Sequence, residues 1–367
     1  MVVADPAIVV GDPPPVLVDE WHRHPPVWDA VRRAVDDDPS GGRFLLTGSA
    51  PTTATHSGAG RIASVRMRPM CLEERGRAEP AVSFAALAQG AGGPVRGSCG
   101  LGLRDYVDEI VAGGWPGMRH LSGPALRAQL DGYVDRIVEH DLAEAGYTVR
   151  RPEIVKAWLR AYAAATATTA SWEAIRDAAT PGLTNKPARR TTSVYTELLT
   201  ALRVLDPVPA WIPSYNVFAR LGAAPKHHLV DPSLAVRLLD LTAERLLRGS
   251  DAGMADPRDG AVLGALFESL VALSVRTSAQ VLGGPVFHLR NEQGRREVDF
   301  VVEHEGRVLA IEAKLASVVT DRDVRHLVAL RRELGDRWID GLVVTTGPEA
   351  YRRPDGIAVV PLGVLGR

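Results

Sequence analysis

Two segments near the C-terminus, Glu297-Val298-Asp299-Phe300-Val301-Val302 and, after a short turn, Ile311-Glu312-Ala313-Lys314, carry the clearest structural pattern in the chain. Both segments are apolar runs that predict strands, and the polar, glycine-containing residues between them predict a hairpin turn. Because side chains two positions apart on a strand share a face, Glu312 and Lys314 point the same way, and the hairpin brings Asp299 beside them.

These residue types predict a metal-dependent site. Two carboxylates hold a hard Mg²⁺ or Mn²⁺ with open water positions, while a lysine orients or activates the water that attacks a phosphodiester. Glu268 belongs to the helix predicted at 261–275 and is positioned to reach the same cluster. We therefore predict Glu268, Asp299, Glu312 and Lys314 as catalytic residues, the three carboxylates as metal ligands, and His326 as a further candidate. The alternative is an inactive domain whose charges form a satisfied ion-pair cluster.

The N-terminal segment predicts a strand, a helix and a second strand, as in a parallel sheet. The first strand, Val16-Leu17-Val18, ends in Asp19 and Glu20; the helix covers 27–35; the second strand begins at Arg43 and runs into Thr47-Gly48-Ser49. At such strand ends a phosphoryl-transfer enzyme places an acid for Mg²⁺ and a polar group for the attacking water. The predicted nucleotide-site residues are Asp19, Glu20, Ser49 and Arg61.

A phosphate loop needs G-x-x-x-x-G-K-[S/T] between a strand and a helix. None of the four lysines follows a glycine, the first is Lys156, and only fifteen residues precede Val16. We therefore expect weak or no ATP binding by this chain. Two alternatives are that Asp19, Glu20 and Arg61 serve only as strand-end polar groups, and that translation starts upstream.

The middle of the chain, from Leu103 to about Leu247, has mostly helical apolar spacing. Within it, 172–178 and 188–205 have the spacing of a helix-turn-helix, and the extended stretch 208–212 could form a wing. Lys186, Arg189 and Arg190 would lie at the N-terminal end of the second helix, where a DNA reader places its contacts. The alternative is that this unit packs on a protein partner.

Composition limits the protein class. A chain of 367 residues with 46% apolar content predicts two or three globular domains, and a net charge of −1 without a basic run restricts nucleic-acid binding to a local patch. Cys71 and Cys99 lack metal or disulfide spacing. We found neither a signal peptide nor a membrane span, and expect a cytoplasmic protein. Only four of the 43 basic residues are lysines. A lysine kept in such an arginine-rich chain is a candidate for a position that needs a compact ammonium group, and the alternative is chance surface placement.

Several motifs continue these signals along the chain: Gly60-Arg61-Ile62, Gly113-Gly114-Trp115-Pro116-Gly117 and Leu229-Val230-Asp231-Pro232. Together with the N-terminal strands and the C-terminal motifs, they resemble in order and spacing a bacterial AAA-type ATP-binding protein family with a C-terminal domain of unknown function 4143. Trp21 and His22 depart from the aliphatic residue and glutamine expected after the two acids.

The resemblance implies a fold that is partly α/β and partly α. It implies a partial AAA-type P-loop domain at 1–100 with Walker B and sensor segments but no Walker A, a helical domain with a winged helix at 101–250, and a restriction-endonuclease-like domain at 251–367. The implied function is a metal-dependent DNA nuclease-like protein. The alternative is a catalytically inactive, ATP-regulated DNA- or protein-binding module, and a homo-oligomer or a partner protein stays open.

Overall fold

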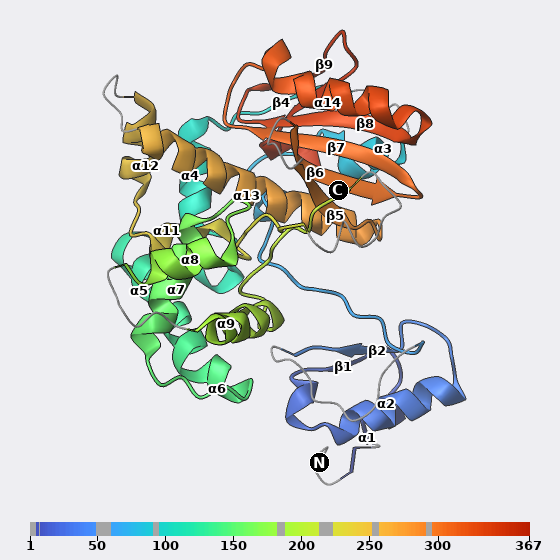
Figure 1. Ribbon diagram of the computed structural model, residues 1–367. Helices are drawn as coiled ribbons and strands as arrows, with labels where there is room; N and C mark the ends of the chain where they lie inside the picture. Colours follow the sequence, from blue (N-terminus) through green and yellow to red (C-terminus); the bar gives the residue numbers. More distant parts are fainter. Residues whose placement is uncertain are drawn as a thin grey trace.

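The computed structural model describes residues 5–6, 8–48, 60–90, 95–181, 188–212, 223–251, 257–290 and 296–367. Figure 1 shows a small α/β unit at the N-terminus, joined by an extended segment to a larger body. That body consists of a helical unit and a mixed sheet covered by helices. The mixed α/β class predicted from the sequence is therefore confirmed. The AAA, winged-helix and endonuclease-like folds are more specific assignments and stay predictions.

The N-terminal unit has the predicted strand, helix and strand. β1 (Val16–Val18) and β2 (Phe44–Leu46) are parallel, and α2 (Pro26–Asp37) connects them. Pro26 occupies the first turn of α2, where its missing N–H costs nothing. The helix buries its apolar face against one side of the strands. Leu17 and Leu45 pair on the other side and are 62% and 60% exposed.

The helical unit is held together by apolar and aromatic side chains. Trp158, Tyr162 and Trp172 stack on one another, and Tyr195 meets Trp158 edge to face. The helices of this unit are α4 (Leu103–Ala112), α5 (Gly123–Arg136), α6 (Leu142–Glu144), α7 (Pro152–Ala164), α8 (Trp172–Ala179), α9 (Arg189–Ala201), α11 (Pro232–Leu238) and α12 (Ala243–Asp251).

The larger sheet has seven strands in the order β4-β9-β10-β8-β7-β6-β5. Its strands are β4 (Gly97–Ser98), β5 (Val286–Arg290), β6 (Glu297–His304), β7 (Arg307–Lys314), β8 (Trp338–Thr345), β9 (Glu349–Arg352) and β10 (Ala358–Pro361). β6 and β7 form the predicted antiparallel hairpin, and β8 is parallel to both β7 and β10.

Helices cover both faces of this sheet. Alternate β6 and β7 residues, such as Phe300 and Ile311, join the core that contains α13 (Pro257–Val281) and α3 (Phe84–Gln89). The intervening residues, such as Val301 and Ala310, pack with α14 (Asp321–Leu334). Burial on both faces explains why these strands read as nearly continuous apolar runs.

The structure divides the chain differently from the predicted boundary near residue 100. β4 pairs with β9 in the C-terminal sheet, and α3 packs on the same sheet. β3 (Val82–Ser83) pairs in parallel with β11 (Leu365–Gly366) at the C-terminus. Residues 82–90 and 95–98, assigned from the sequence to the first domain, therefore complete the last one.

The predicted wing at 208–212 forms a short ribbon that joins the helical unit to the sheet. Val208 and Lys226 exchange both backbone hydrogen bonds at 2.8 Å. Further along, Trp211 donates its backbone N–H to His288 on β5, is buried in the core beneath α14, and donates its ring N–H to Glu303. The ribbon is therefore tied to the C-terminal domain.

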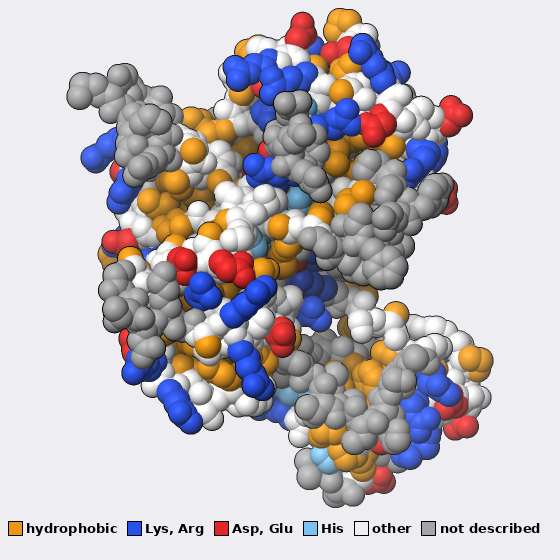
Figure 2. All heavy atoms as spheres, in the orientation of Figure 1, with side chains coloured by type: hydrophobic (Ala, Val, Ile, Leu, Met, Phe, Trp, Pro, Cys, Tyr) orange, Lys and Arg blue, Asp and Glu red, His pale blue; other side chains and the backbone are white. Residues whose placement is uncertain are grey.

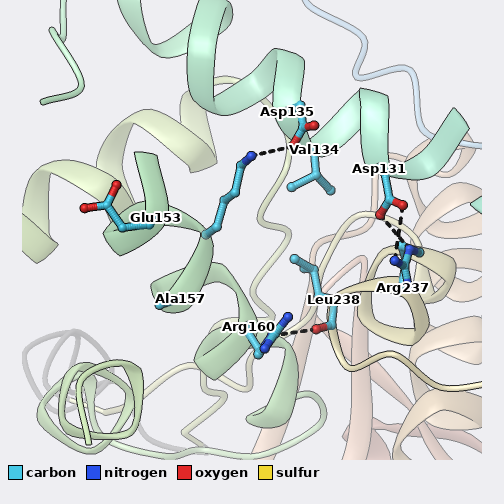
Figure 3. A pocket seen from close by; sticks show the side chains of 9 residues that line it. Asp131, Val134, Asp135, Glu153, Ala157, Arg160, Arg237 and Leu238 are labelled. Carbon is cyan, nitrogen blue, oxygen red and sulfur yellow. Dashed lines mark hydrogen bonds and ion pairs between the residues drawn. The ribbon is translucent and has the colours of Figure 1, made fainter. Parts of the chain in front are cut away.

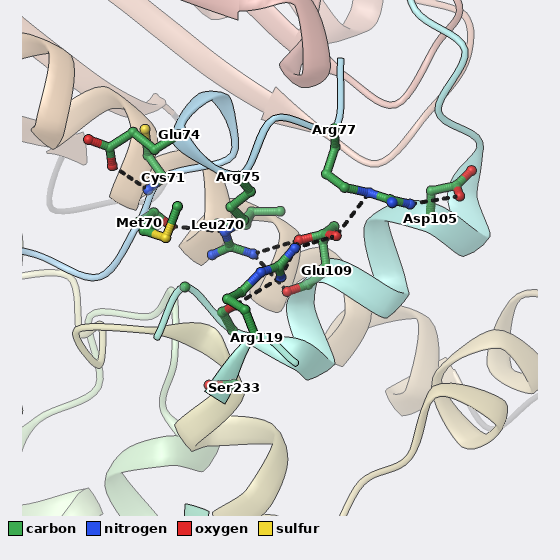
Figure 4. A network of polar contacts seen from close by, with 12 residues as sticks. Met70, Cys71, Glu74, Arg75, Arg77, Asp105, Glu109, Arg119, Ser233 and Leu270 are labelled. Atoms are coloured by element: carbon green, nitrogen blue, oxygen red, sulfur yellow. Dashed lines mark hydrogen bonds and ion pairs between the residues drawn. The ribbon is translucent and has the colours of Figure 1, made fainter. Parts of the chain in front are cut away.

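A polar network explains two of the motifs (Figure 4). The buried Arg75 guanidinium donates to the carbonyl of Met70 and to Glu109, and Arg119 donates to both carboxylate oxygens of Glu109. Asp231 accepts from the N–H groups of Gly114 and Ser233, so it caps α11 and fixes the glycine turn. These motifs therefore have a structural role that joins three segments.

The segment Gly260–Val281 of α13 is long and apolar enough to cross a membrane, with a mean hydropathy of 1.4. We predicted no stretch of this length and hydropathy from the sequence and therefore missed this one. More than half of this segment is buried inside the fold, and α13 contacts β5, β6 and β7. α13 is therefore placed as a core helix.

Candidate functional site

β6 and β7 bring the two central carboxylates together just beyond their paired residues. The register between the two strands runs from His304 and Arg307 to Phe300 and Ile311. Beyond it, the Ala313 N–H donates to Asp299, and the charges of Asp299 and Lys314 both act on Glu312. The convergence of Asp299, Glu312 and Lys314 therefore rests on these contacts at the end of the hairpin.

A second lysine completes the cluster from outside the hairpin. Lys226 has a fully buried side chain, and its Nζ lies 2.9 Å from Glu268 Oε1 and 2.9 Å from Asp299 Oδ1. Glu297 Oε1 is 3.4 Å from the same nitrogen. The lysine therefore connects the α13 carboxylate to those of β6.

Lys314 and Glu312 form the other half of the cluster. Lys314 Nζ donates to Glu312 Oε2 at 2.8 Å, and the Ala313 N–H donates to Asp299 Oδ2 at 2.9 Å. Glu312 Oε1 is buried and has no hydrogen-bond partner within the described part of the chain. Lys314 is one-third exposed, so the cluster meets solvent at this end.

The charges shift one another's proton affinities. Burial and the Asp299 charge raise the pKa of Glu268 to about 8, and the same two causes raise the pKa of Glu312 well above its usual range. Against the effect of burial, Lys226 and Lys314 hold the pKa of Asp299 down to about 2. The cluster thus combines one carboxylate whose pKa is held low with two whose pKa values are raised.

The cluster contains more acids than bases. Glu268, Glu297, Asp299 and Glu312 face two ammonium groups, which leaves two negative charges uncompensated when all four acids are ionised. Among the residues that the structure describes, no group of three or more His, Cys, Asp or Glu side chains is arranged to hold a metal ion. The three-carboxylate ligand set stays a prediction.

Basic side chains lie around this end of the sheet. On α14, Arg322 and Arg325 are exposed, and Arg325 donates to His326. The pKa of His326 is lowered mainly by burial and next by the charge of Arg325. The charges of Lys314 and Arg296 lower it further. Figure 2 shows Lys and Arg side chains over the region of α14. Asp321 and Asp323 lie on the same helix, so basic and acidic side chains are interspersed at this end of the sheet.

The predicted nucleotide-site residues do not form one cluster. Thr47 donates its hydroxyl to Asp19, and Glu20 lies within ion-pair distance of His22 and Arg23. Arg61 pairs with Asp36 on α2. Ser49 lies outside the described residues. Asp19 and Thr47 are thus brought together at the ends of β1 and β2, while Arg61 contacts the connecting helix.

Two of the three predicted nucleic-acid residues, Arg189 and Arg190, lie at the start of α9. Arg189 is exposed and pairs with Glu173 at 3.4 Å, and Arg190 is exposed. Lys186 lies outside the described residues.

Elsewhere, α5, α7 and α11 line a pocket of about 310 Å³ (Figure 3). Its cations have partners inside it: Lys156 binds Asp135, Arg237 binds Asp131, and Arg160 donates to the Leu238 carbonyl. This internal pairing leaves the pocket without a distinct charge for a ligand.

Lys226 is the site residue that motif reasoning missed. Its position in the sequence, 226, lies well before the predicted motif residues, which fall between 268 and 314. The rarity of lysine was the signal that could have found it, because two of the four lysines occupy this cluster. Glu297 was also overlooked, although it shares a strand face with Asp299.

Two family models match separate parts of the chain, one in the helical unit and one in the C-terminal domain. Residues 263–365 match a family described as "Domain of unknown function (DUF4143)", and residues 103–245 match one described as "Domain of unknown function (DUF8612)". Uncharacterized proteins of Mycobacterium bovis and Mycobacterium tuberculosis are each 26% identical over 367 residues, covering 98% of this chain and 71% of the relative. The predicted C-terminal domain of unknown function is thereby supported.

Proposed function

We propose that the C-terminal domain hydrolyses DNA phosphodiester bonds with the help of a divalent cation, Mg²⁺ or Mn²⁺. The observation that carries this proposal is the proximity of the Asp299 and Glu312 carboxylates at the end of the β6–β7 hairpin, with the Lys314 ammonium bound to Glu312. This is the constellation expected for metal-assisted hydrolysis.

The residues present fit such a cation. Glu312 Oε1 is buried without a donor in the described chain, and the cluster has an excess of acid over base. Asp299 and Glu312 would hold the cation, because hard divalent ions prefer carboxylate oxygens. When bound, it would polarise the scissile phosphate and lower the pKa of an attached water.

The protein's own groups would orient the reaction. Lys314 lies at the solvent-facing end, where its ammonium can hold a water or a phosphate oxygen. Glu268 binds Lys226, and Lys226 in turn binds Asp299. Because Glu268 acts on the metal ligands only through this lysine, we assign it a positioning role. Arg322 and Arg325 would contact the DNA backbone, which fixes orientation without reading sequence.

The test is cleavage of linear and branched DNA by the full chain in Mn²⁺. Glu312→Gln and Lys314→Met should each lower the cleavage rate by at least about 100-fold, the scale of losing a positioned acid–base or charged group. Lys156→Met, a surface lysine paired with Asp135, is the matched control and should cleave normally. Thermal melts verify that the variants fold. Unchanged cleavage by folded Glu312→Gln would refute the assignment.

A second candidate is a catalytically inactive DNA- or protein-binding module. It is favoured by Lys226, which satisfies Glu268 and Asp299 without any metal. Under this function the wild-type chain retains DNA in a filter assay but leaves it intact in Mn²⁺. Arg189 and Arg190 would then contribute contacts, and Arg189→Ala with Arg190→Ala should weaken retention.

The AAA-type origin of the N-terminal unit is also a proposal. It is supported by the parallel pairing of β1 and β2 and by the contact between Thr47 and Asp19. We expect no submillimolar binding of Mg-ATP by this chain in calorimetry. Such binding would favour a module regulated by ATP.

A further inference from the structure

We infer that Lys226 serves as a permanent cation in the acidic cluster, so that the cluster takes one divalent ion, on the Asp299–Glu312 side. This inference rests on the metal-binding part of the proposed function and specifies its stoichiometry. Phosphodiester-cleaving sites with two metals place them about 3.5–4 Å apart between shared carboxylates. Here the Lys226 ammonium contacts Asp299, the carboxylate that two such ions would share.

Three carboxylates surround the Lys226 ammonium. Its Nζ donates to Glu268 and to Asp299, and Glu297 Oε1 lies within ion-pair distance at 3.4 Å. Asp299 Oδ1 faces Lys226, while Asp299 Oδ2 accepts from the backbone of Ala313. A second divalent ion would have to displace this ammonium to reach Glu268.

The surroundings of Lys226 hold it in place. The N–H and C=O of Lys226 are both bonded to Val208, in the ribbon that continues to the buried Trp211. The side chain itself has no exposed surface. Because the backbone is anchored and the ammonium is enclosed among carboxylates, we take Lys226 as a fixed part of the site.

The Glu312 side differs in each of these respects. Its lysine partner, Lys314, is one-third exposed and contacts one oxygen, while the other oxygen has no partner in the described chain. The cluster is therefore asymmetric, with a closed cation position at Glu268 and an open one at Glu312.

The test is a titration of the full chain with Mn²⁺ alone, followed by electron paramagnetic resonance. Wild type should bind one Mn²⁺ per chain. Glu312→Gln should weaken binding by at least about 10-fold, whereas Glu268→Gln, the matched variant on the Lys226 side, should change it by less than about 3-fold. Lys226→Met should admit a second Mn²⁺, because it frees the oxygens of Glu268 and Asp299.

The outcomes separate this inference from the proposed nuclease function. Two Mn²⁺ ions per wild-type chain, no binding at all, or equal losses in Glu268→Gln and Glu312→Gln would overturn the inference. If Lys226→Met does not fold, the wild-type stoichiometry and the two glutamine variants still decide. One bound Mn²⁺ without DNA cleavage would support the inference and refute the nuclease function.

Discussion

The N-terminal unit and the C-terminal domain both place acids near strand ends, but only the C-terminal domain encloses them. In the N-terminal unit, two three-residue strands carry Asp19 near the surface, and one sheet face is exposed at Leu17 and Leu45. In the C-terminal domain, seven strands covered by helices bury Asp299 and Glu312. Burial strengthens the interactions of a charge and perturbs its pKa. Similar residue patterns thus acquire different chemistry.

The largest test of this difference is Lys226→Met. Removing the ammonium leaves the carboxylates of Glu268 and Asp299 buried without their partner, which typically costs about 3–5 kcal/mol of unfolding free energy. Lys156→Met, which breaks an exposed pair, should cost at most about 1 kcal/mol. Chemical denaturation measures both, and comparable losses would contradict the enclosed character of the cluster.

The next effect is on acid stability. Burial lowers the pKa of His288 to about 4, and that of His228 well below its usual range, with Lys226 acting in the same direction. Below the unfolded pKa of 6.5 the unfolded chain binds more protons, so stability should fall as the pH drops from 6.5 to 4. For His288 alone the loss approaches about 3 kcal/mol.

Urea denaturation of wild type and His288→Gln at several pH values measures this dependence. The substitution should flatten the loss between pH 6.5 and 4, because the glutamine does not titrate. An unchanged slope in the variant would show that His288 does not contribute.

A smaller effect is expected at the junction of the helical unit. A Cβ on Gly114 would lie 2.2 Å from the Met70 carbonyl oxygen, and this oxygen belongs to the backbone. Gly114→Ala should therefore cost about 1–3 kcal/mol through overpacking. Gly117→Ala, in the same motif, meets nothing within 4 Å and should leave the melting temperature nearly unchanged. Equal shifts in the two variants would rule out this steric cause.

The smallest effect is expected on the open face of the N-terminal unit. Leu45→Ser should change the unfolding free energy by less than about 0.5 kcal/mol, because the side chain is exposed. Val31→Ala on α2, which removes a buried side chain, should cost about 2 kcal/mol. A large effect of Leu45→Ser in differential scanning calorimetry would show that this face is covered in solution.

The sequence predicted those parts of the site that local patterns determine. Alternation along β6 and β7 placed Asp299, Glu312 and Lys314 together, because the hairpin keeps their separation short. It did not predict Lys226, since contact between that residue and Glu268 depends on how a ribbon from another unit packs. Nor did it predict that β3, α3 and β4 belong with the C-terminal domain, because pairing of two-residue strands such as β4 leaves almost no periodicity to read.

The position of Lys226 in the sequence limits which gene segments recombination can exchange. The segment that matches a domain family begins at residue 263, yet the lysine that neutralises its buried acids lies upstream of that boundary. A gene fusion that moved residues 263–365 alone would transfer a domain with unbalanced charge at its centre. Recombination that preserves the fold therefore has to keep the ribbon and the sheet in one exchangeable block.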